Sequence, residues 1–416
     1  MSAGAKRHDV VIAGGGIAGL ALACALADAL GPGSRIAVAD RAPLRPGAGA
    51  ADARAFALAA GSKHMLSVLG VWAAIAEHAQ PVTKVEITDS SLDDAFRPVL
   101  VAYDNTVGGG EPATFIVEHG RLRAALLAAA AARPAIALMG EAPVQGFQAD
   151  EHGVTVELAS GAASHALRAA LLVAADGRGS PLRRAAGIQI VRWDYPQAGI
   201  VVTVAHTEPH EGRAVQHFLP SGPFAILPLT GSRSCVTWTE EATVAQAILA
   251  RDDAGFLAEV EKRFDWRLGE VRLAGPRASW PLDMHLARAL VRDRFALVGD
   301  AAHGVHPIAG QGLNLGLRDV AALAEAVADA ARLGLDVGSG MVLERYERWR
   351  RLDAAVSAAT FDALNRLFSN DWTLLRSARD LGLGLVERLP ALKQFFVAEA
   401  AGLTGEVPKL LRGEPV

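Results

Sequence analysis

The stretch "VVIAGGGIAGLALACALA", residues 10–27, decides the fold. Four apolar residues come first, the glycine-rich run "GGGIAG" (14–19) follows, and a second apolar run continues to about Leu30. This order predicts a strand, a tight turn and a helix, as at the start of a dinucleotide-binding unit. The next apolar stretch, "RIAVAD", ends in Asp40. Its separation in sequence from the glycine turn is near that expected for an acid that hydrogen-bonds a ribose.

An alternative interpretation exists for the same residues. The uncharged run follows Lys6 and Arg7, as in a signal peptide, and it is marginal in length for a membrane span. A signal peptide explains neither the glycine spacing nor Asp40, so we favour the dinucleotide unit.

Composition narrows the class of protein. The chain has 416 residues, 51% of them apolar, which is ample for a packed core. A net charge of −4 provides no basic field for nucleic acid. The two cysteines, Cys24 and Cys235, make no disulfide framework, which fits a reducing cytoplasm.

Two further stretches place acids and glycines after apolar runs. In "ALLVAADGRGSPLRRAAG" (170–187) a predicted strand ends at Asp176, and Ser180 with Pro181 caps a short helix. In "GDAAHGVHPIAGQGLNLGLRDVAAL" (299–323) Asp300 follows an apolar run, and a helix with Leu313 and Leu317 on one face ends the stretch. The first glycine turn alone does not separate NAD from FAD. A chain that builds a ligand-facing turn more than 250 residues later favours the longer cofactor, FAD.

With these motifs the chain resembles the FAD-dependent aromatic hydroxylases of the p-hydroxybenzoate hydroxylase type. It is most similar to the flavin hydroxylases of ubiquinone biosynthesis, through "HPIAGQGLNLGLRD" (306–319) and supporting stretches such as "WDYPQAGIVVTV" and "GPFAILPL". The resemblance implies an α/β fold: an FAD-binding, Rossmann-like domain with an inserted, mostly antiparallel β-sheet substrate domain and a C-terminal helical region.

The resemblance also implies which residues hold the cofactor. Gly14, Gly16, Ile17, Ala18 and Gly19 would lie at the pyrophosphate, with Asp40 and Arg41 at the adenosine ribose. Arg54 would reach the cofactor, although a solvated arginine at a helix start is a rival interpretation. Asp176 would also bind the cofactor, and Asp300 would bind the ribityl hydroxyls. The isoalloxazine would lie along Gly310, Gln311, Gly312, Leu313 and Asn314, and His306 and Pro307 would shape the space where oxygen reacts.

His119 receives no such role, and the pair His303 and His306 is not assigned to a metal. Relatives commonly place asparagine or arginine about where His119 stands, so neither His119 nor Arg121 is assigned to the cofactor. His303 and His306 are three residues apart, but no carboxylate or cysteine cluster completes a metal site. We therefore expect no metal, and FAD bound without a covalent link, since no cysteine or histidine lies in a recognised attachment setting.

The expected organisation has three parts. Residues 1–183 and 284–340 form the FAD domain, within which 81–117 contribute strands on the substrate side. An early helix is expected to carry Leu58, Met65, Leu69 and Trp72 on one face. Residues 184–283 form the substrate-binding sheet, and 341–416 form the helical region. The predicted substrate wall consists of Gln216, Phe218 and Phe224, each of which could equally be an ordinary sheet residue.

The function implied by the resemblance is hydroxylation of the aromatic ring of a polyprenylated phenol, through a flavin C4a-hydroperoxide formed with O2. Electrons would come from NAD(P)H or a ferredoxin-like protein. Two alternatives stay open. One is a related FAD enzyme that acts on another aromatic or on an isoprenoid alkene, by epoxidation or reduction. The other is a non-catalytic FAD-bound partner of a ubiquinone-biosynthesis complex.

Such a lipophilic substrate predicts a cytoplasmic protein that works at the inner face of a membrane, as a peripheral contact or through a partner complex. The stretch 374–403 mixes leucine and phenylalanine with Arg376, Arg379, Arg388 and Lys393. It is expected either to pack as a helix on the FAD domain or to turn an apolar face edged by these bases toward lipid or a partner.

Overall fold

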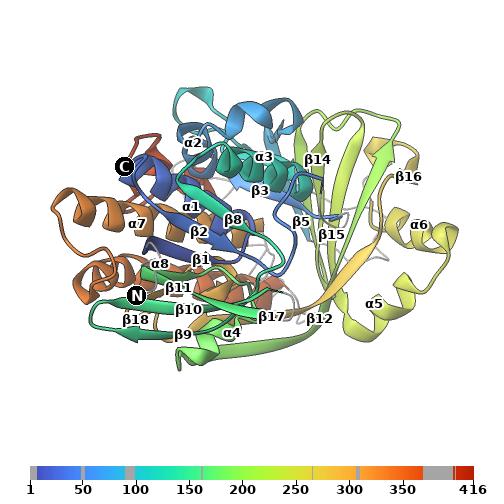
Figure 1. The fold of residues 1–416 in the computed structure, drawn as a ribbon. Coiled ribbons are helices and arrows are strands. Elements are labelled where there is room, and N and C mark those ends of the chain that lie inside the picture. Colours follow the sequence, from blue (N-terminus) through green and yellow to red (C-terminus); the bar gives the residue numbers. More distant parts are fainter. Residues whose placement is uncertain are drawn as a thin grey trace.

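Two large sheets lie side by side in the protein (Figure 1). The computed structural model describes residues 7–47, 52–89, 99–160, 163–264, 266–305, 310–368, 397–398 and 400–416. The first sheet has the order β18-β19-β11-β1-β2-β8, and β10 and β9 extend it from β11. Its strands are β1 (His8–Ala13), β2 (Ile36–Ala39), β8 (Ile136–Met139), β9 (Val144–Asp150), β10 (Gly153–Ser160), β11 (Ala163–Ala174), β18 (Val291–Arg292) and β19 (Phe295–Leu297).

The central strands of this sheet run in the same direction. β1 pairs in parallel with β2 and β11, β2 with β8, and β11 with β19. Parallel strands end at one edge of a sheet, and ligands bind outside that edge in open α/β folds. The residues that follow β1, β2, β11 and β19 are Gly14, Asp40, Ala175 and Val298, and Asp176 and Asp300 come just after the last two. The predicted glycine turn and the three predicted acids therefore lie at one edge of the sheet.

Helices cover this sheet. Their bounds are α1 (Ile17–Leu30), α2 (Ala60–Val68), α3 (His119–Ala131), α4 (Pro181–Ala185), α7 (Gly312–Arg332) and α8 (Gly340–Phe368). α1 contacts α3 and α7, and α7 also contacts α8. Ten of the 14 residues of α1 are buried, which explains why its sequence is apolar on all sides. The residues that suggested a signal peptide thus form β1 and α1 inside the core.

The second sheet contains the strands that were predicted between 184 and 283. Its order is β20-β17-β12-β15-β14-β13-β5-β6, with β16 beside β12. Its neighbouring strands are antiparallel except for β13 and β5, which are parallel. β5 and β6 come from the 81–117 segment. The bounds are β5 (Lys84–Asp89), β6 (Val99–Asp104), β12 (Ile190–His206), β13 (Arg213–Leu219), β14 (Gly222–Leu229), β15 (Arg233–Glu241), β16 (Val271–Leu273), β17 (Ala278–Ala287) and β20 (His303–Gly304).

The two faces of the second sheet have different neighbours. One face packs beneath α5 (Ala242–Leu249) and α6 (Asp253–Glu261), at the outer side of the molecule (Figure 1). The other face packs against a small sheet of order β3-β7-β4, through Ala57 and Ile116. Its strands are β3 (Ala55–Ala59), β4 (Gln80–Pro81) and β7 (Thr114–Glu118).

One predicted helix begins later than expected. Leu58 lies in β3, where it pairs with Phe115 of β7, and α2 begins only at Ala60. Trp72 lies beyond α2 in a separate 3-10 turn. The apolar spacing suits a helix, but the hydrogen bonds available on β7 draw the first residues into a strand.

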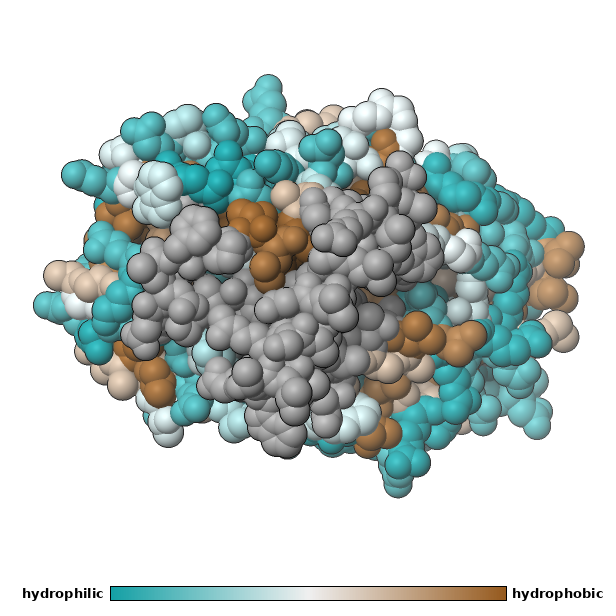
Figure 2. Space-filling view, turned by 180° about the vertical axis from the view of Figure 1, so that it is seen from behind, coloured by the Kyte–Doolittle hydropathy of each residue, from teal (hydrophilic) through white to brown (hydrophobic). Residues whose placement is uncertain are grey.

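The C-terminal region lies against the first sheet. The Tyr346 hydroxyl of α8 donates a 2.7 Å hydrogen bond to the carbonyl of Leu297 at the end of β19. Of the stretch 374–403, nearly all lies outside the described residues. Among the helices that the structure describes, none is long and apolar enough to cross a membrane. Seen from behind (Figure 2), the coloured surface carries apolar residues in separate groups between hydrophilic ones.

Candidate cofactor site at the carboxyl edge of the first sheet

The turn between β1 and α1 requires glycine at two positions and leaves open space at a third. Gly14 has a φ of +116°, and a side chain there would collide with the carbonyl of Ala175. Gly19 lies equally tight against the carbonyl of Gly14. Among the residues that the structure describes, a Cβ on Gly16 would have no heavy atom within 4 Å, and no side chain caps α1. The uncapped N–H groups and the helix dipole suit a phosphate at this place.

Asp40 lies beside this turn at the end of β2. Its Oδ2 accepts a 2.5 Å hydrogen bond from the N–H of Gly15, and its Oδ1 accepts one of 2.7 Å from Ala42. The neighbouring Arg41 is exposed, whereas Ile17 at the start of α1 is buried. Each carboxylate oxygen of Asp40 therefore keeps a lone pair for a hydroxyl donor such as a ribose.

Arg54 is held by a carboxylate. Its Nε and Nη2 donate to the two oxygens of Asp52, at 2.9 and 2.6 Å. Nδ1 of His119 lies 2.9 Å from Oδ2 of Asp52, close enough for an ion pair but without hydrogen-bond alignment. Burial lowers the pKa of His119, which favours the neutral ring. The structure thus joins Arg54 and His119 through Asp52, while Arg121 lies 3.6 Å from Glu118 instead.

Asp176 offers an unsatisfied acceptor. Its Oδ1 is buried and has no hydrogen-bond partner among the described residues, while its Oδ2 accepts a 3.3 Å bond from the N–H of Leu182. Burial raises the pKa of this carboxyl group. The predicted helix cap is confirmed, because Ser180 accepts a 2.9 Å hydrogen bond from the N–H of Arg183. A buried acceptor of this kind calls for a donor from a ligand or water.

Asp300 follows β19 in a tight turn. Gly299 has a φ of +61°, and a Cβ there would lie 3.3 Å from the Cβ of Ala18 on α1. The carbonyl of Asp300 lies 3.0 Å from Nε2 of His285. Burial lowers the pKa of His285 to about 4, so a neutral ring donates this bond. The carboxylate itself is exposed and faces a cavity.

The glycines before α7 have a second explanation besides room for a flat ring. Gly310 has a φ of +64°, and a Cβ there would lie 3.1 Å from the Cβ of Ala57 in β3. Gly312 begins α7, and its Cβ would make an ordinary 3.6 Å contact with Val305. The turn and the β3 contact account for Gly310 without any bound ring.

Asn314 anchors this turn. Its Oδ1 accepts hydrogen bonds from the N–H of Ala59 at 2.9 Å and the hydroxyl of Ser62 at 2.8 Å. Its Nδ2 donates to the carbonyl of Ala57 at 2.8 Å and to Gln311 at 3.1 Å. The side chain is buried with its hydrogen bonds used, so it ties the start of α7 to β3 and α2. Leu313, next to it, packs half-buried against the main core.

Two predicted residues, His306 and Pro307, lie outside the described residues. Within the described part of the chain, no group of three or more histidine, cysteine, aspartate or glutamate side chains could hold a metal ion.

A cavity of about 1050 Å³ opens beside this edge. Arg54 and Asp300 line one part of it, and the segments 178–192 and 280–285 line the rest. It has the size of a site for a large organic ligand. Its walls join the first sheet to β12 and β17 of the second.

Arginines dominate that wall. Arg178 donates to Oδ1 of Asp283 at 2.5 Å, and Arg192 lies 3.6 Å from the same carboxylate. Arg183 is 3% exposed, yet its guanidinium donates to the carbonyls of Ala301 (2.6 Å) and Arg178 (3.0 Å) and lies 3.5 Å from Nε2 of His285. Among the described residues, no carboxylate lies within ion-pair distance of Arg183. A buried cation without an anion favours a negatively charged ligand.

Sequence reasoning missed this group. The stretch "DGRGSPLRR" predicts a strand end and a helix cap, and it also contains three arginines within seven residues, 178–184. That density after a strand end was the available signal. Only folding shows that Arg192 and Asp283, far along the chain, join it.

The predicted substrate wall is divided between two faces. Ala214, Gln216 and Phe218 alternate on β13, so they share the face on which Ala214 packs toward β3 and β7. Gln216 has a buried Nε2 without a hydrogen-bond partner among the described residues. Phe224 pairs with His217, takes the opposite face and lies fully buried against Trp238 beneath α6. Phe224 is therefore a core residue and does not share that wall.

Together the glycine turn, the acids at the strand ends and the antiparallel second sheet define an FAD-binding α/β protein. The FAD binding domain family matches residues 7–360, and the chain belongs to that family. It is an FAD-dependent monooxygenase.

Known proteins resemble the chain over nearly its whole length. A protein named ubiquinone hydroxylase UbiL from Rhodospirillum rubrum is 43% identical over 99% of this chain and 94% of its own. The 3-demethoxyubiquinol 3-hydroxylase of Escherichia coli is 32% identical over 95% of this chain and 98% of its own. These relatives confirm the subfamily inferred from the 306–319 stretch.

Solved structures agree on the fold. The p-nitrophenol 4-monooxygenase PnpA of Pseudomonas putida superposes with a TM-score of 0.79, covering 96% of this chain and 99% of that one, at 20% identity. PqsL of Pseudomonas aeruginosa, described as a probable FAD-dependent monooxygenase, gives a TM-score of 0.74 over 91% and 99%, at 22% identity.

Proposed function

We propose that this monooxygenase hydroxylates the aromatic ring of a polyprenylated phenol in ubiquinone biosynthesis. The observation that carries the proposal is the full-length similarity, 43% over 99% of the chain, to a protein named ubiquinone hydroxylase. The edge of the first sheet supports it, because the residues present there fit FAD. Within the described part of the chain, Gly16 faces open space, no side chain caps α1, and Oδ1 of Asp176 has no hydrogen-bond donor.

Several parts of FAD have a group that would hold them. The N–H groups at the start of α1 would bind the pyrophosphate, Asp40 a ribose and Asp300 the ribityl hydroxyls. When bound, FAD supplies the electron transfer and the oxygen activation. The start of α7, which no side chain of the described residues caps, would stabilise negative charge on the reduced ring through the helix dipole.

The protein's own contribution to the hydroxylation is position and exclusion of water. Gln216 and Phe218 would form part of the substrate wall on the inner face of the second sheet. The Gln216 amide, whose Nε2 has no hydrogen-bond partner among the described residues, suits a phenol oxygen, and Phe218 suits an apolar ring or tail.

The purified, FAD-loaded protein tests this function directly. A short-chain polyprenylated phenol, offered with a reductant, should stimulate oxygen uptake and gain one oxygen atom on its ring by mass spectrometry. A product epoxidised or reduced on the prenyl chain would favour the alkene-modifying alternative. FAD binding without any substrate-stimulated turnover would favour the non-catalytic partner. Deleting the gene and identifying the accumulated quinone precursor would name the ring position.

The electron donor belongs to the same proposal. The arginine-lined wall of the cavity suits an anionic donor, and both NAD(P)H phosphates and an acidic ferredoxin surface are anionic. Stopped-flow reduction of the bound flavin with NADH, with NADPH and with a reduced ferredoxin separates them. Arg192→Glu should slow reduction by whichever donor is used, since it reverses one charge at the cavity wall.

A further inference from the structure

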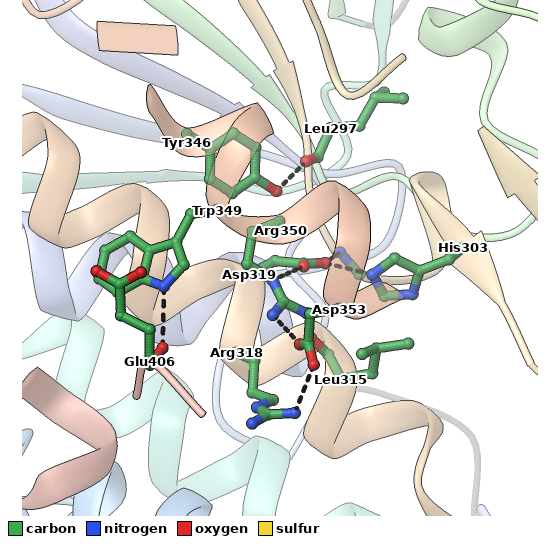
Figure 3. A network of polar contacts seen from close by, with 11 residues as sticks. Leu297, His303, Leu315, Arg318, Asp319, Tyr346, Trp349, Arg350, Asp353 and Glu406 are labelled. Carbon is green, nitrogen blue, oxygen red and sulfur yellow. Dashed lines mark hydrogen bonds and ion pairs between the residues drawn. The ribbon is translucent and has the colours of Figure 1, made fainter. Parts of the chain in front are cut away.

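A single buried carboxylate connects four elements behind the cofactor edge (Figure 3). Asp319 of α7 is 0% exposed. Its Oδ2 accepts hydrogen bonds from the N–H of Gly299 at 2.9 Å and from Nε2 of His303 at 2.6 Å. Its Oδ1 accepts a 2.8 Å bond from Nε of Arg350 on α8. α7, the turn after β19, β20 and α8 therefore meet at one side chain.

Two of the groups that bond to Asp319, Gly299 and His303, lie next to segments proposed to bind FAD. Gly299 immediately precedes Asp300, and His303 lies in β20, after which the chain leads to Gly310 and the start of α7. Asp319 thus holds the turn that carries Asp300 against the helix whose N-terminus begins at Gly312. Asp319 is therefore bonded between two elements that carry groups proposed to bind FAD, Asp300 and the N-terminus of α7.

The packing around the turn leaves little freedom. A Cβ on Gly316 of α7 would lie 3.1 Å from the Cα of Gly299, so the helix and the turn touch through their backbones. Burial alone would raise the pKa of Asp319, but His303 and Arg350 outweigh it and hold that pKa below its usual range. The carboxylate is therefore ionised and rigidly bonded.

Helix α8 supports the arrangement from the other side. Arg350 also pairs with Asp353, and Asp353 accepts a 3.1 Å contact from Arg318 of α7. Tyr346, one helical turn earlier, bonds to the end of β19. The same face of α8 thus holds the strand, the carboxylate and α7 in one unit (Figure 3).

We propose that Asp319 is a positioning residue for the flavin: through Gly299 and His303 it sets the placement of Asp300 relative to the N-terminus of α7. This inference rests on the proposed role of Asp300 toward FAD. A purely structural ion network would stabilise the protein without affecting the affinity for FAD or the spectrum of the bound flavin.

Two substitutions displace the turn by different routes. Asp319→Asn keeps the shape of the side chain but replaces one of its two acceptor oxygens with an NH2 group, where three donors now bond to a carboxylate. Gly316→Ala leaves every charge in place and presses a methyl group on Gly299. Alanine is also a better helix former than glycine, so a loss of FAD affinity in this variant cannot arise from a weaker helix. The matched control is Glu240→Gln, a buried carboxylate that pairs with Arg263 at 3.1 Å in the distant core beneath α6.

The measurements are the dissociation constant of FAD by titration of apoprotein, the visible spectrum of the bound flavin, and the thermal stability of the apoprotein. We expect Asp319→Asn and Gly316→Ala to raise the dissociation constant of FAD by roughly tenfold or more and to shift the flavin bands. A tenfold change corresponds to the loss of about one charge-assisted hydrogen bond. Glu240→Gln should lower apoprotein stability and leave the FAD constant within about twofold, since additivity holds for distant sites.

Asp300→Ala serves as the reference. If it weakens FAD binding while Asp319→Asn and Gly316→Ala bind FAD like wild type, the positioning inference is wrong and the proposed cofactor site stands. If Asp300→Ala also binds FAD like wild type, the proposed role of Asp300 fails and the inference fails with it. Should Asp319→Asn not fold, Gly316→Ala alone decides.

Discussion

Replacing Asn314 with aspartate would test how the first turn of α7 is tied to β3. The Oδ1 side of the site is compatible with a carboxylate, since it receives hydrogen bonds from Ala59 and Ser62. The Nδ2 side is not, because it donates to the carbonyl of Ala57 and to Oε1 of Gln311, which are both acceptors. Asn314→Asp therefore sets an anionic oxygen against two oxygens in a site that is 4% exposed.

The cost can be worked from these contacts. Two hydrogen bonds are lost at about 0.5–1.5 kcal/mol each, and a buried carbonyl left without a donor costs about 1–3 kcal/mol more. The sum is on the order of 3 kcal/mol at neutral pH. Burial and repulsion should also raise the pKa of the introduced carboxyl group above its unfolded value. A raised pKa gives a stability contribution that is present at low pH and is lost as the pH rises through that pKa.

Urea unfolding of the apoprotein at about pH 5.5 and about pH 8 checks the direction, with FAD titration at both values. The stability gap between Asn314→Asp and wild type should be larger at the higher pH, and the FAD constant should rise with it. Asn105→Asp is the matched control, since Asn105 is 3% exposed and donates a 3.0 Å bond to Val82 away from the turn. It should lose stability without losing FAD affinity. An equal gap at both pH values would refute the reasoning about Asn314.

Four other outcomes are expected. Asp300→Ala should weaken FAD binding by roughly 1.5–3 kcal/mol, the worth of a hydrogen bond to a charged group, and full flavin occupancy at low FAD would contradict the site. The purified protein should be yellow and should release intact FAD on mild denaturation, whereas flavin that stays with the precipitated chain would show a covalent link. His285 is neutral in the fold, with a pKa lowered to about 4, so its contribution to stability is present above the unfolded value of about 6.5 and is lost as the pH falls toward 4. His285→Gln should therefore flatten the acid limb of the stability curve, by a total on the order of 3 kcal/mol, and an unchanged limb would argue against a buried neutral ring. Finally, the protein should float with anionic liposomes less well when Arg379 and Arg388 are changed to glutamate, and flotation equal to wild type with FAD retained would make the 374–403 stretch structural only.

Several features were predictable because short-range interactions decide them. The glycine turn after β1 follows from backbone conformation at Gly14 and close packing at Gly19. The cap at Ser180 is a contact between residues three apart in sequence. The helix α7 follows from apolar spacing, and the strand-end acids follow from the rule that parallel strands end at one edge.

Other features depend on which segments pair. Leu58 entered a strand because β7 offered hydrogen bonds, and no local pattern shows that partner. Phe224 lies on the helix-covered face because it stands opposite His217, and a shift of one residue in register would have reversed its face.

The sequence alone determined the dinucleotide unit, the acids at the strand ends and the family, because local conformation and a specific motif carry that information. Only the tertiary structure decided the arginine wall and the carboxylate behind it. Arg183 meets Ala301 across 118 residues, and Asp319 meets Arg350 across 31. Such contacts depend on how sheets and helices pack, since burial and partner geometry, rather than residue type, determine whether a charge is exposed, paired or available to a ligand.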